Sequence, residues 1–417
     1  MYQLWNKDNL IAVFDIKNVG GVIETVSDVE IFGELPLDMR TFEQWLTGRN
    51  VLMDRKKAET LMQNLGIVTI ADHIEFTNCA SLFDTFWVKS SNSNLKWEEV
   101  SLFQNSFSEY LSKFTMSAEA DVRNVGKRRH LSPEYHTSGS FDRCWIREGE
   151  KIYMLKAGSH GFVNSGKEPF SEVYVNQLEK AMGIQEYVEY SLMYYERRLP
   201  GTSNVVKSIV TKCDLLTTEQ TGMISASKLG ITNYEELLKY CRDIIGQEEV
   251  EKAVQMLLLD CLTVNTDRHM GNISLLIDND TLQVKGMAPI YDNNMALLPM
   301  YMPEYDDIYE YASNRNPAVG ESFEEVVKLC YEYTSKPEQM KELLRKLASG
   351  FQFEYVDFAP EIFDQRRVKE LSELVQCRAV RYLDLLRSLQ KEQKYGPDTL
   401  ANLSENGVKA HSRGIKR

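Results

Sequence analysis

Hydrophobic residues recur with two different periods along the chain, and each period predicts a different kind of element. Near the N-terminus, residues 10–16 and 22–32 are rich in β-branched and aromatic side chains, which favours two strands. Helical spacing of apolar residues is found in three further segments, residues 37–49, 54–66 and 95–114. We therefore expect a small α/β unit over residues 1–125.

A second group of strands begins near residue 141. Two strand-like runs, residues 141–146 and 151–157, flank the short glycine-containing turn REGE, which predicts a hairpin. A helix is expected over residues 170–183 and another strand over residues 204–213. Residues 126–215 are therefore predicted to form a strand-rich lobe.

After residue 215 the pattern becomes mostly helical. Residues 248–262 are strongly apolar and predict a helix that is buried nearly all round. Ser322, with Glu325 three residues later, is a capping box that starts another helix. A last long helix is expected over residues 366–390. The chain is therefore predicted to be an α+β protein whose helical lobe spans residues 216–395.

Composition narrows the class of protein. The 417 residues carry a net charge of −13, which argues against the broad basic face of a nucleic-acid-binding protein. The basic stretches are residues 126–130 and the tail over residues 396–417, which we expect to be a solvated loop and a disordered end. No segment approaches the roughly 18 consecutive apolar residues of a membrane span, and we expect no secretion signal.

The cysteines indicate the compartment. There are seven of them, at wide spacings and without a C-x-x-C pair. This pattern predicts neither a disulfide framework nor a zinc site. A reducing cytoplasm fits it best, so we expect a cytoplasmic protein.

A polar run between an apolar helix and an apolar strand holds the candidate chemistry. In NTDRHMGN, Asp267 and Asn272 are five residues apart, and Asp292 follows twenty residues after Asn272. The catalytic loop of protein kinases has the same Asp–Asn spacing, and a later aspartate holds the metal ions. Phosphoryl transfer needs a carboxylate that orients the attacking hydroxyl and oxygen ligands that hold Mg²⁺. We therefore predict Asp267 as the catalytic residue, and Asn272 and Asp292 as magnesium ligands.

Residues upstream supply the other parts of a phosphoryl-transfer site. The small residues Ser138, Gly139 and Ser140 in HTSGS form a candidate phosphate loop. Lys156 ends the second strand of the predicted hairpin, and Glu172 in the following helix can pair with it. The order of these parts along the chain makes the combination specific.

Each part also has a simpler explanation. The polar loop could cap its neighbouring elements, HTSGS could be an ordinary turn, and Lys156 could be a solvated residue at the end of a strand. Glu172 has two nearby glutamates, Glu168 and Glu179, and any of the three could lie on the surface. His269 fits a structural role, or hydrogen bonding beside a phosphate, better than the role of a base.

The segments LLLDCLTVNTDRHMGNISLL and APIYDNNMAL closely resemble the catalytic segment of HipA-like serine/threonine kinases. The D-R-H-x-x-N motif of that family is matched by Asp267, Arg268, His269 and Asn272, and its metal aspartate by Asp292. The resemblance covers residues 135–390, and residues 316–328 also look familial. The first 120 residues resemble the N-terminal extension of such proteins more weakly. A two-lobed kinase-like fold, distantly similar to the phosphatidylinositol kinases, is implied.

The resemblance also implies a nucleotide site. ATP should be the phosphoryl donor and Mg²⁺ the cofactor, with Lys156 on the phosphates. The adenine is expected beside the strand end formed by Lys212, Cys213 and Asp214. The family has a loop serine that can be autophosphorylated and then leaves the site, and Ser138 and Ser140 are the candidates here.

The family further implies partners. Many members are toxins that bind a small DNA-binding antitoxin, and known targets include aminoacyl-tRNA synthetases. We therefore predict a serine/threonine protein kinase with a protein substrate, with no direct binding to nucleic acid or membrane. The alternatives are a kinase of small molecules or lipids and an inactive nucleotide-binding relative.

Overall fold

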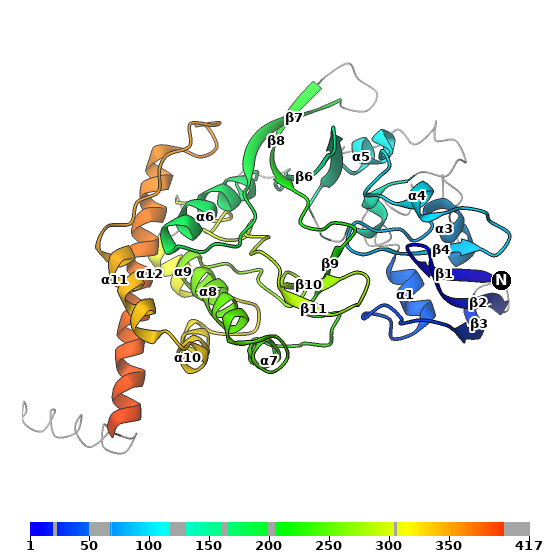
Figure 1. Ribbon diagram of the computed structural model, residues 1–417. Coiled ribbons are helices and arrows are strands. Elements are labelled where there is room, and N and C mark those ends of the chain that lie inside the picture. Colours follow the sequence, from blue (N-terminus) through cyan, green and yellow to red (C-terminus); the bar gives the residue numbers. More distant parts are fainter. Residues whose placement is uncertain are drawn as a thin grey trace, which may run out of the picture.

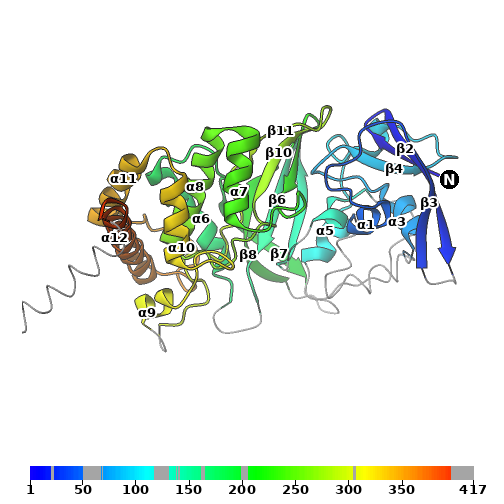
Figure 2. The same cartoon turned by 90° about the horizontal axis from the view of Figure 1, so that it is seen from below.

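The computed structural model describes residues 1–19, 23–49, 67, 69–116, 131–137, 139, 141–160, 165–198, 205–303 and 307–395. The helix predicted over residues 54–66, the basic stretch over residues 126–130 and the tail over residues 396–417 lie outside the described residues, as do Ser138 and Ser140. The N-terminal strands and the long helix α12 (Gln365–Tyr395) lie at opposite ends of the molecule, with two further sheets between them (Figures 1 and 2).

The first sheet is antiparallel and belongs to the N-terminal part of the chain. Its spatial order is β3 (Ile23–Ile31), β2 (Asn9–Val19), β1 (Tyr2–Asn6) and β4 (Phe86–Ser90). The strands predicted over residues 10–16 and 22–32 are thereby confirmed. Helices α1 (Phe42–Gly48) and α3 (Ile70–Thr77) pack with this sheet around a core that includes Leu4, Phe14, Trp45 and Ile74.

The single helix predicted over residues 95–114 is wrong, because the chain turns inside it. The structure has α4 (Trp97–Val100) and α5 (Glu109–Met116), joined by an irregular segment. Trp97 Nε1, Ser101 Oγ and Gln104 Nε2 donate hydrogen bonds to the same carboxylate oxygen of Glu219, at 2.9, 2.8 and 2.8 Å. Contacts with a residue far along the chain thus override the local helical spacing.

The second sheet contains the predicted hairpin. Its order is β5 (Arg143–Glu148), β6 (Lys151–Ala157), β8 (Val205–Asp214) and β7 (Ser191–Arg198). Helix α6 (Glu168–Met182) packs against this sheet and ends at Gly183, whose φ of 74° suits glycine. The hairpin, the helix over residues 170–183 and the strand over residues 204–213 are therefore confirmed.

The part after residue 215 is mostly helical, as predicted, but it also contains a small sheet. Its order is β11 (Val284–Met287), β10 (Ser274–Asp278) and β9 (Thr221–Ser225). One π-helical turn, η3 (Cys241–Ile245), precedes α8. A short 3₁₀ helix, η2 (Pro133–His136), lies outside this part of the chain and precedes β5. The helices are α7 (Tyr234–Tyr240), α8 (Gln247–Thr263), α9 (Ile308–Ser313), α10 (Phe323–Tyr333), α11 (Pro337–Gly350) and α12.

The largest hydrophobic core surrounds α8. The helix predicted over residues 248–262 is confirmed, and every residue of α8 from Met256 to Thr263 is buried. Burial all round is wrong for the first half of α8, where Glu248 is exposed and Lys252 is half-buried. The capping box of Ser322 and Glu325 starts α10 as predicted. The apolar face of α12 packs on the same core, for example through Leu371 and Val375, so the second half of α8 is enclosed by its neighbours. No described helix is both long and apolar enough to cross a membrane.

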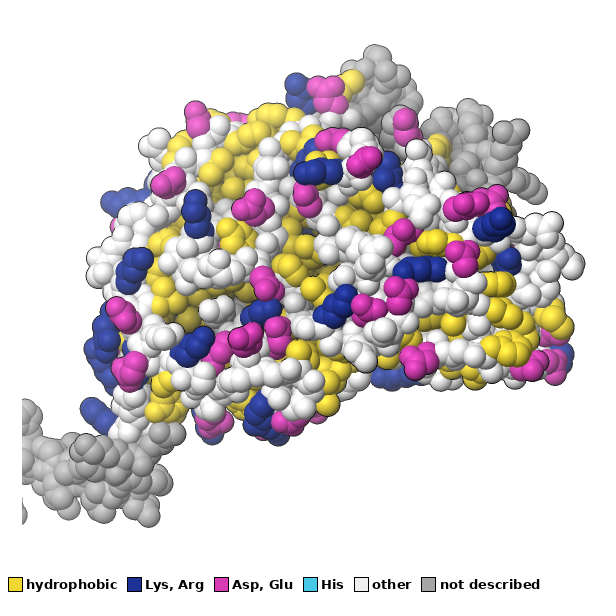
Figure 3. Space-filling model, viewed as in Figure 1, with side chains coloured by type: hydrophobic (Ala, Val, Ile, Leu, Met, Phe, Trp, Pro, Cys, Tyr) yellow, Lys and Arg dark blue, Asp and Glu magenta, His cyan; other side chains and the backbone are white. Residues whose placement is uncertain are grey.

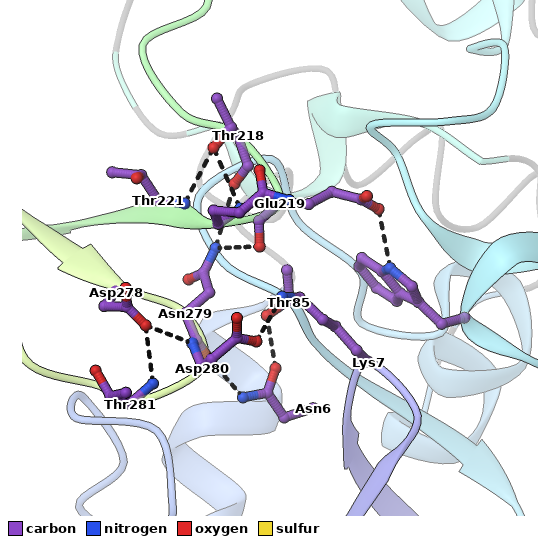
Figure 4. A network of polar contacts seen from close by, with 12 residues as sticks. Asn6, Lys7, Thr85, Thr218, Glu219, Thr221, Asp278, Asn279, Asp280 and Thr281 are labelled. Carbon is purple, nitrogen blue, oxygen red and sulfur yellow. Dashed lines mark hydrogen bonds and ion pairs between the residues drawn. The ribbon is translucent and has the colours of Figure 1, made fainter.

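Polar contacts fasten the N-terminal unit to the tips of β9 and β10 (Figure 4). Asn6 Nδ2 donates to the carbonyl of Asn279 at 2.7 Å, and Lys7 Nζ forms an ion pair with Asp280 at 2.5 Å. Asn279 Nδ2 in turn donates to the carbonyls of Thr218 and Glu219, at 3.2 and 3.3 Å. The first sheet is thus fixed against the small sheet of the helical lobe.

Charges of both signs are mixed on the face of the molecule shown in Figure 3. On the face shown in Figure 3, Lys and Arg side chains alternate with Asp and Glu side chains. That face has no continuous basic area among the described residues, in keeping with the net charge of −13.

Candidate active site

A cavity of about 600 Å³ lies where the three sheets approach one another. The N-terminal unit contributes wall residues such as Leu37, Arg49 and Phe83. The second sheet and its flanking loop contribute Gly139, Arg143, Lys156, Cys213 and Asp214. The helical lobe contributes Asp267, His269, Asn272 and Asp292. Most residues that the sequence singled out therefore face one space.

Lys156 lies at the end of β6 and is almost completely buried, with 3% of its surface exposed. Its Nζ lies 3.0 Å from Oε1 of Glu172 and forms a second ion pair with Asp292. Glu172 is held by Thr211 Oγ1, which donates to its Oε2 at 2.6 Å. Burial would lower the pKa of Lys156, but Asp292 and Glu172 outweigh burial and raise it. Lys156 is therefore a charged residue inside the cavity wall, not a solvated one.

The three glutamates of α6 are all buried, so the surface alternative is wrong for each of them. Glu168 Oε2 accepts a hydrogen bond from the N–H of Ser159 at 3.1 Å. Glu179 Oε1 accepts one from Asn293 Nδ2 at 3.3 Å. Glu172 is the one of the three that pairs with Lys156.

The loop after α8 begins where Val264 takes a left-handed conformation, with φ of 54°. Within the loop, Asn265 Oδ1 accepts a hydrogen bond from the N–H of Asp267 at 3.3 Å, and Asn272 Nδ2 donates to the carbonyl of Asp267 at 3.0 Å. The side-chain nitrogen of Asn272 thus forms a hydrogen bond within the loop, which leaves its side-chain oxygen available to a ligand. Burial raises the pKa of Asp267, partly opposed by His269.

Asp292 has a left-handed backbone conformation, with φ of 59°, at the start of the segment after β11. Such a conformation costs free energy in a residue other than glycine and is frequent at functional sites. The N–H of Asp292 donates to the hydroxyl of Tyr190 at 3.2 Å. Burial would raise the pKa of Asp292, but Lys156 and Arg143 outweigh burial and hold it at about 2. Asp292 is therefore ionised at neutral pH.

Asp292 and Asn272 fit a magnesium ion better than they fit a metal ion whose ligands all come from the protein. Asp292 and Asn272 offer a carboxylate and an amide oxygen, which are hard ligands of the kind that Mg²⁺ binds. Among the described residues, no cluster of three or more His, Cys, Asp or Glu side chains could enclose a metal ion. Mg²⁺ commonly uses one or two protein oxygens together with phosphates and water. The arrangement thus suits an ion that arrives with a nucleotide.

The predicted adenine side is only partly assembled. Cys213 and Asp214 line the cavity, but Lys212 does not. In the ladder of β6 and β8, Cys213 pairs with Met154, which lines the cavity, whereas Lys212 pairs with Leu155, which does not. Lys212 Nζ instead lies 2.6 Å from Oε2 of Glu148 and 3.9 Å above the ring of Tyr153. The structure does not bring the Lys212 side chain to the other candidates.

Two smaller features concern the loops. Gly139 has φ of 121°, a conformation that residues with a side chain rarely adopt, so a substitution there would be strained. The neighbouring Ser138 and Ser140 lie outside the described residues, and their role stays a prediction. His269 lines the cavity, and its Nδ1 accepts a hydrogen bond from the N–H of Gly271 at 2.9 Å.

Sequence reasoning missed Arg143 and Tyr190. Arg143 pairs with Lys156 in the register of β5 and β6, which places both side chains on the cavity face of the hairpin. This could have been found once the register was known, but the turn alone does not fix it. Tyr190 contacts Asp292 from a distant segment, and nothing in the local sequence signals that contact.

Comparison with known proteins agrees with this architecture. A two-lobed kinase-like fold, with the cavity between its sheets and its helical lobe, is the class that the fold defines. The family model described as HipA-like C-terminal domain matches residues 113–353, more than half of the chain, and the protein therefore belongs to that family. No curated protein matches the chain significantly.

Solved structures that match this chain include the following two. HipA from Shewanella oneidensis MR-1, in a complex with HipB and operator DNA, is 12% identical, with a TM-score of 0.51. That match covers 94% of this chain and 99% of the HipA chain. The proinflammatory kinase CtkA from Helicobacter pylori is 17% identical over 58% of this chain and 94% of its own, with a TM-score of 0.37. At these identities the HipA match supports the shared fold, and the CtkA match adds no further argument.

Proposed function

We propose that this protein is an ATP- and Mg²⁺-dependent serine/threonine kinase that phosphorylates a hydroxyl group of another protein. The observation that carries the proposal is the buried Lys156 of the cavity wall, which pairs with both Glu172 and Asp292. Asp267 and Asn272 line the same cavity. Membership of the HipA-like family supports the same reaction class.

Each described residue has a distinct part in this reaction. Lys156 is positioned by Glu172 and would bind phosphate oxygens of ATP as a point charge. Asp267 would accept the hydrogen bond and then the proton of the acceptor hydroxyl. Asn272 and Asp292 would hold Mg²⁺, which neutralises charge that develops on the phosphates.

The environments of the two aspartates support these different parts. Burial raises the pKa of Asp267, which makes it a better proton acceptor. At Asp292, Lys156 and Arg143 outweigh the effect of burial and hold the pKa at about 2, as a metal ligand requires.

The proposals on regulation and on partners rest on relatives of this chain. The Shewanella HipA forms a complex with HipB and operator DNA, and we propose a small DNA-binding antitoxin as a partner of this protein too. We also propose autophosphorylation at Ser138 or Ser140. A phosphate of about −1.5 to −2 charge would compete with ATP phosphates for the same loop.

Incubation with labelled ATP and Mg²⁺, followed by mass spectrometry of the protein and of a cell lysate, tests the proposal. Phosphoserine or phosphothreonine on lysate proteins, absent with Asp267→Asn, is the expected result. Label confined to a lipid or metabolite fraction would instead make the enzyme a lipid or small-molecule kinase. Metal-dependent ATP binding without any transfer would make it an inactive relative.

Intact-mass measurement of the purified protein after the same incubation tests autophosphorylation. A gain of one phosphate, located between His136 and Arg143, is the expected result. An active enzyme without phosphate in that segment would remove this mode of regulation.

A further inference from the structure

Arg268 follows the candidate base and has no part in the reaction described so far. Its side chain is fully buried and donates five hydrogen bonds. A guanidinium group is a rigid planar fork, and it fixes the relative positions of the groups that accept from it. Arg268 therefore ties together the segments to which its acceptors belong.

One acceptor is Asp260, near the end of α8. Arg268 Nε donates to Oδ2 of Asp260 at 2.9 Å and Nη2 donates to Oδ1 at 3.2 Å, and both side chains are 0% exposed. Burial would lower the pKa of Arg268, but Asp260 outweighs burial and raises it, so the guanidinium stays charged. Asp260, near the end of α8, thus anchors the Arg268 side chain.

Of the remaining three acceptors, one belongs to the candidate magnesium ligand Asn272 and two belong to the neighbours of the other candidate, Asp292. Arg268 Nη1 donates to the carbonyl of Asn272 at 3.3 Å and to the carbonyl of Tyr291 at 2.6 Å. Its Nη2 donates to Oδ1 of Asn293 at 2.5 Å. Tyr291 and Asn293 are the chain neighbours of Asp292 on either side. One side chain therefore relates the backbone of Asn272 to the backbone of Asp292.

Contacts from other elements hold this arrangement in place. Asn293 Nδ2 donates to Oε1 of Glu179 on α6 at 3.3 Å. The carbonyl of Arg268 accepts hydrogen bonds from the N–H of Val319 at 3.0 Å and from the hydroxyl of Tyr234. Both the fork and the backbone of Arg268 are thus fixed by the surrounding fold.

We propose that Arg268 is a positioning residue that sets the separation of Asn272 and Asp292, so that both bind one magnesium ion. This inference rests on the proposed function, since it takes those two residues as magnesium ligands. Mutation of residues that orient metal ligands typically costs about 10–100-fold in metal affinity. Lysine would keep the charge, but its single ammonium group cannot serve Asp260 and both loops at once.

The test is Arg268→Lys, with Arg378→Lys as the matched control. Arg378 is also buried, with 4% exposure, and its Nε donates to the carbonyl of Cys261 at 2.8 Å. Its guanidinium lies 4.2 Å over the ring of Phe323, and it does not line the cavity. Both substitutions keep a buried charge and remove a planar fork. Thermal unfolding of each variant first shows whether the fold is kept.

The readout is ATP affinity measured by calorimetry over a series of Mg²⁺ concentrations. We expect Arg268→Lys to need about 10–100-fold more Mg²⁺ for half of the full affinity gain. Arg378→Lys should need the same Mg²⁺ concentration as the wild type. An equal shift in both variants, or no shift in Arg268→Lys, overturns the positioning role.

A second variant keeps the test open if Arg268→Lys does not fold. Asn293→Ala removes the acceptor next to Asp292 and leaves the pair of Arg268 and Asp260 intact. It should also raise the Mg²⁺ requirement, and an unchanged requirement overturns the inference.

Asp292→Ala, measured in parallel, separates the two proposals. If Asp292→Ala keeps the wild-type Mg²⁺ dependence, the metal site itself is wrongly assigned. If Asp292→Ala loses that dependence while both other variants keep it, the positioning role alone fails.

Discussion

At the scale of single residues, environment separates two aspartates that line one cavity. Asp292 is paired with Lys156, and its backbone is held by Tyr190. Asp267 makes no ion pair with a described residue, and its carbonyl and N–H are fixed by Asn272 and Asn265. Under the proposed function, this difference would suit the first carboxylate to a metal ion and the second to the neutral hydroxyl of the acceptor.

Asp267→Asn tests the role of the second carboxylate. The amide keeps the shape of the side chain but cannot accept a proton. We expect turnover to fall by roughly 10²–10⁴-fold, the usual contribution of a positioned general base, with little change in ATP affinity. Steady-state kinetics with calorimetric ATP binding measures both quantities. A parallel loss of ATP affinity would make Asp267 a metal or structural residue instead.

Asn272→Ala and Asp292→Ala test the magnesium ligands. Each variant removes one oxygen ligand, so both should weaken ATP binding in the presence of Mg²⁺. Without Mg²⁺, Asn272→Ala should bind ATP as the wild type does, because that side chain contacts the loop backbone and no charged group. Calorimetry with Mg²⁺ and with a chelator compares the two states. Unchanged metal-dependent affinity in Asp292→Ala would contradict the assignment.

The sequence could identify candidate residues that lie close together in one loop or at a definite place in a predicted element. Asp267 and Asn272 belong to one loop, and Lys156 follows from its place at the end of a strand. Arg143 and Arg268 were not given roles, because their partners come from other segments. The Arg268 side chain, for example, reaches Tyr291 and Asn293 from the loop after α8. Spacing along a chain carries no information about such contacts.

At the scale of elements, α6 contributes a buried polar face. Glu172, Asn176 and Glu179 are spaced four and three residues apart, which places them on one side of a helix. Asn176 Oδ1 accepts from the N–H of Tyr190 at 2.7 Å, and its Nδ2 donates to Oε2 of Glu179 at 2.7 Å. The sequence shows this spacing, but polar residues at helical spacing are more often solvated, so the buried face could not be recognised.

Glu179→Gln tests how this face depends on pH. Burial raises the pKa of Glu179 from 4.5 to about 8. Between pH 4.5 and 8 the unfolded chain has released a proton that the folded protein still holds, so this group lowers stability as pH rises. Glutamine does not titrate, so the variant lacks this dependence of stability on pH. Urea unfolding at several pH values should show the variant gaining stability relative to the wild type from pH 5 to pH 8. A constant difference between the two proteins would show that Glu179 ionises normally.

The irregular segment between α4 and α5 shows the limit of periodicity. Its apolar residues have helical spacing, yet Arg147 Nη2 donates to three carbonyls there, those of Leu102, Phe103 and Asn105, at 2.9, 2.9 and 3.1 Å. These contacts hold the segment in its irregular conformation from a strand outside it. Elements with a local capping signal, such as α10, were predicted correctly because their stabilisation is local.

At the scale of the whole molecule, the N-terminal unit shares its cores with the rest of the chain. Trp87 and Trp97 pack in one cluster with Trp145 and Ile152 of the β5–β6 hairpin. Leu282, from the turn between β10 and β11, packs into the core of the first sheet. The cavity wall formed by the N-terminal unit is therefore held by apolar burial as well as by the polar contacts of Figure 4.

Leu282→Ala tests this shared core, because the residue belongs to the helical lobe while its side chain is buried in the N-terminal unit. Leu282 is 8% exposed, and truncation of a buried leucine typically costs about 2–5 kcal/mol of unfolding free energy. We expect a loss in that range and faster proteolysis within residues 1–116, since their core loses a side chain supplied from outside.

Ile31→Ala is the matched control, because Ile31 belongs to the same unit but is 52% exposed, and its truncation should change stability by no more than about 0.5 kcal/mol. Urea unfolding gives the free energies, and limited proteolysis followed by mass spectrometry gives the cleavage sites. Equal stability and equal cleavage in the two variants would mean that Leu282 does not stabilise the core of the N-terminal unit. The cavity wall would then be held by the cluster of Trp87 and Trp145 and by polar contacts such as those of Asn6 and Lys7.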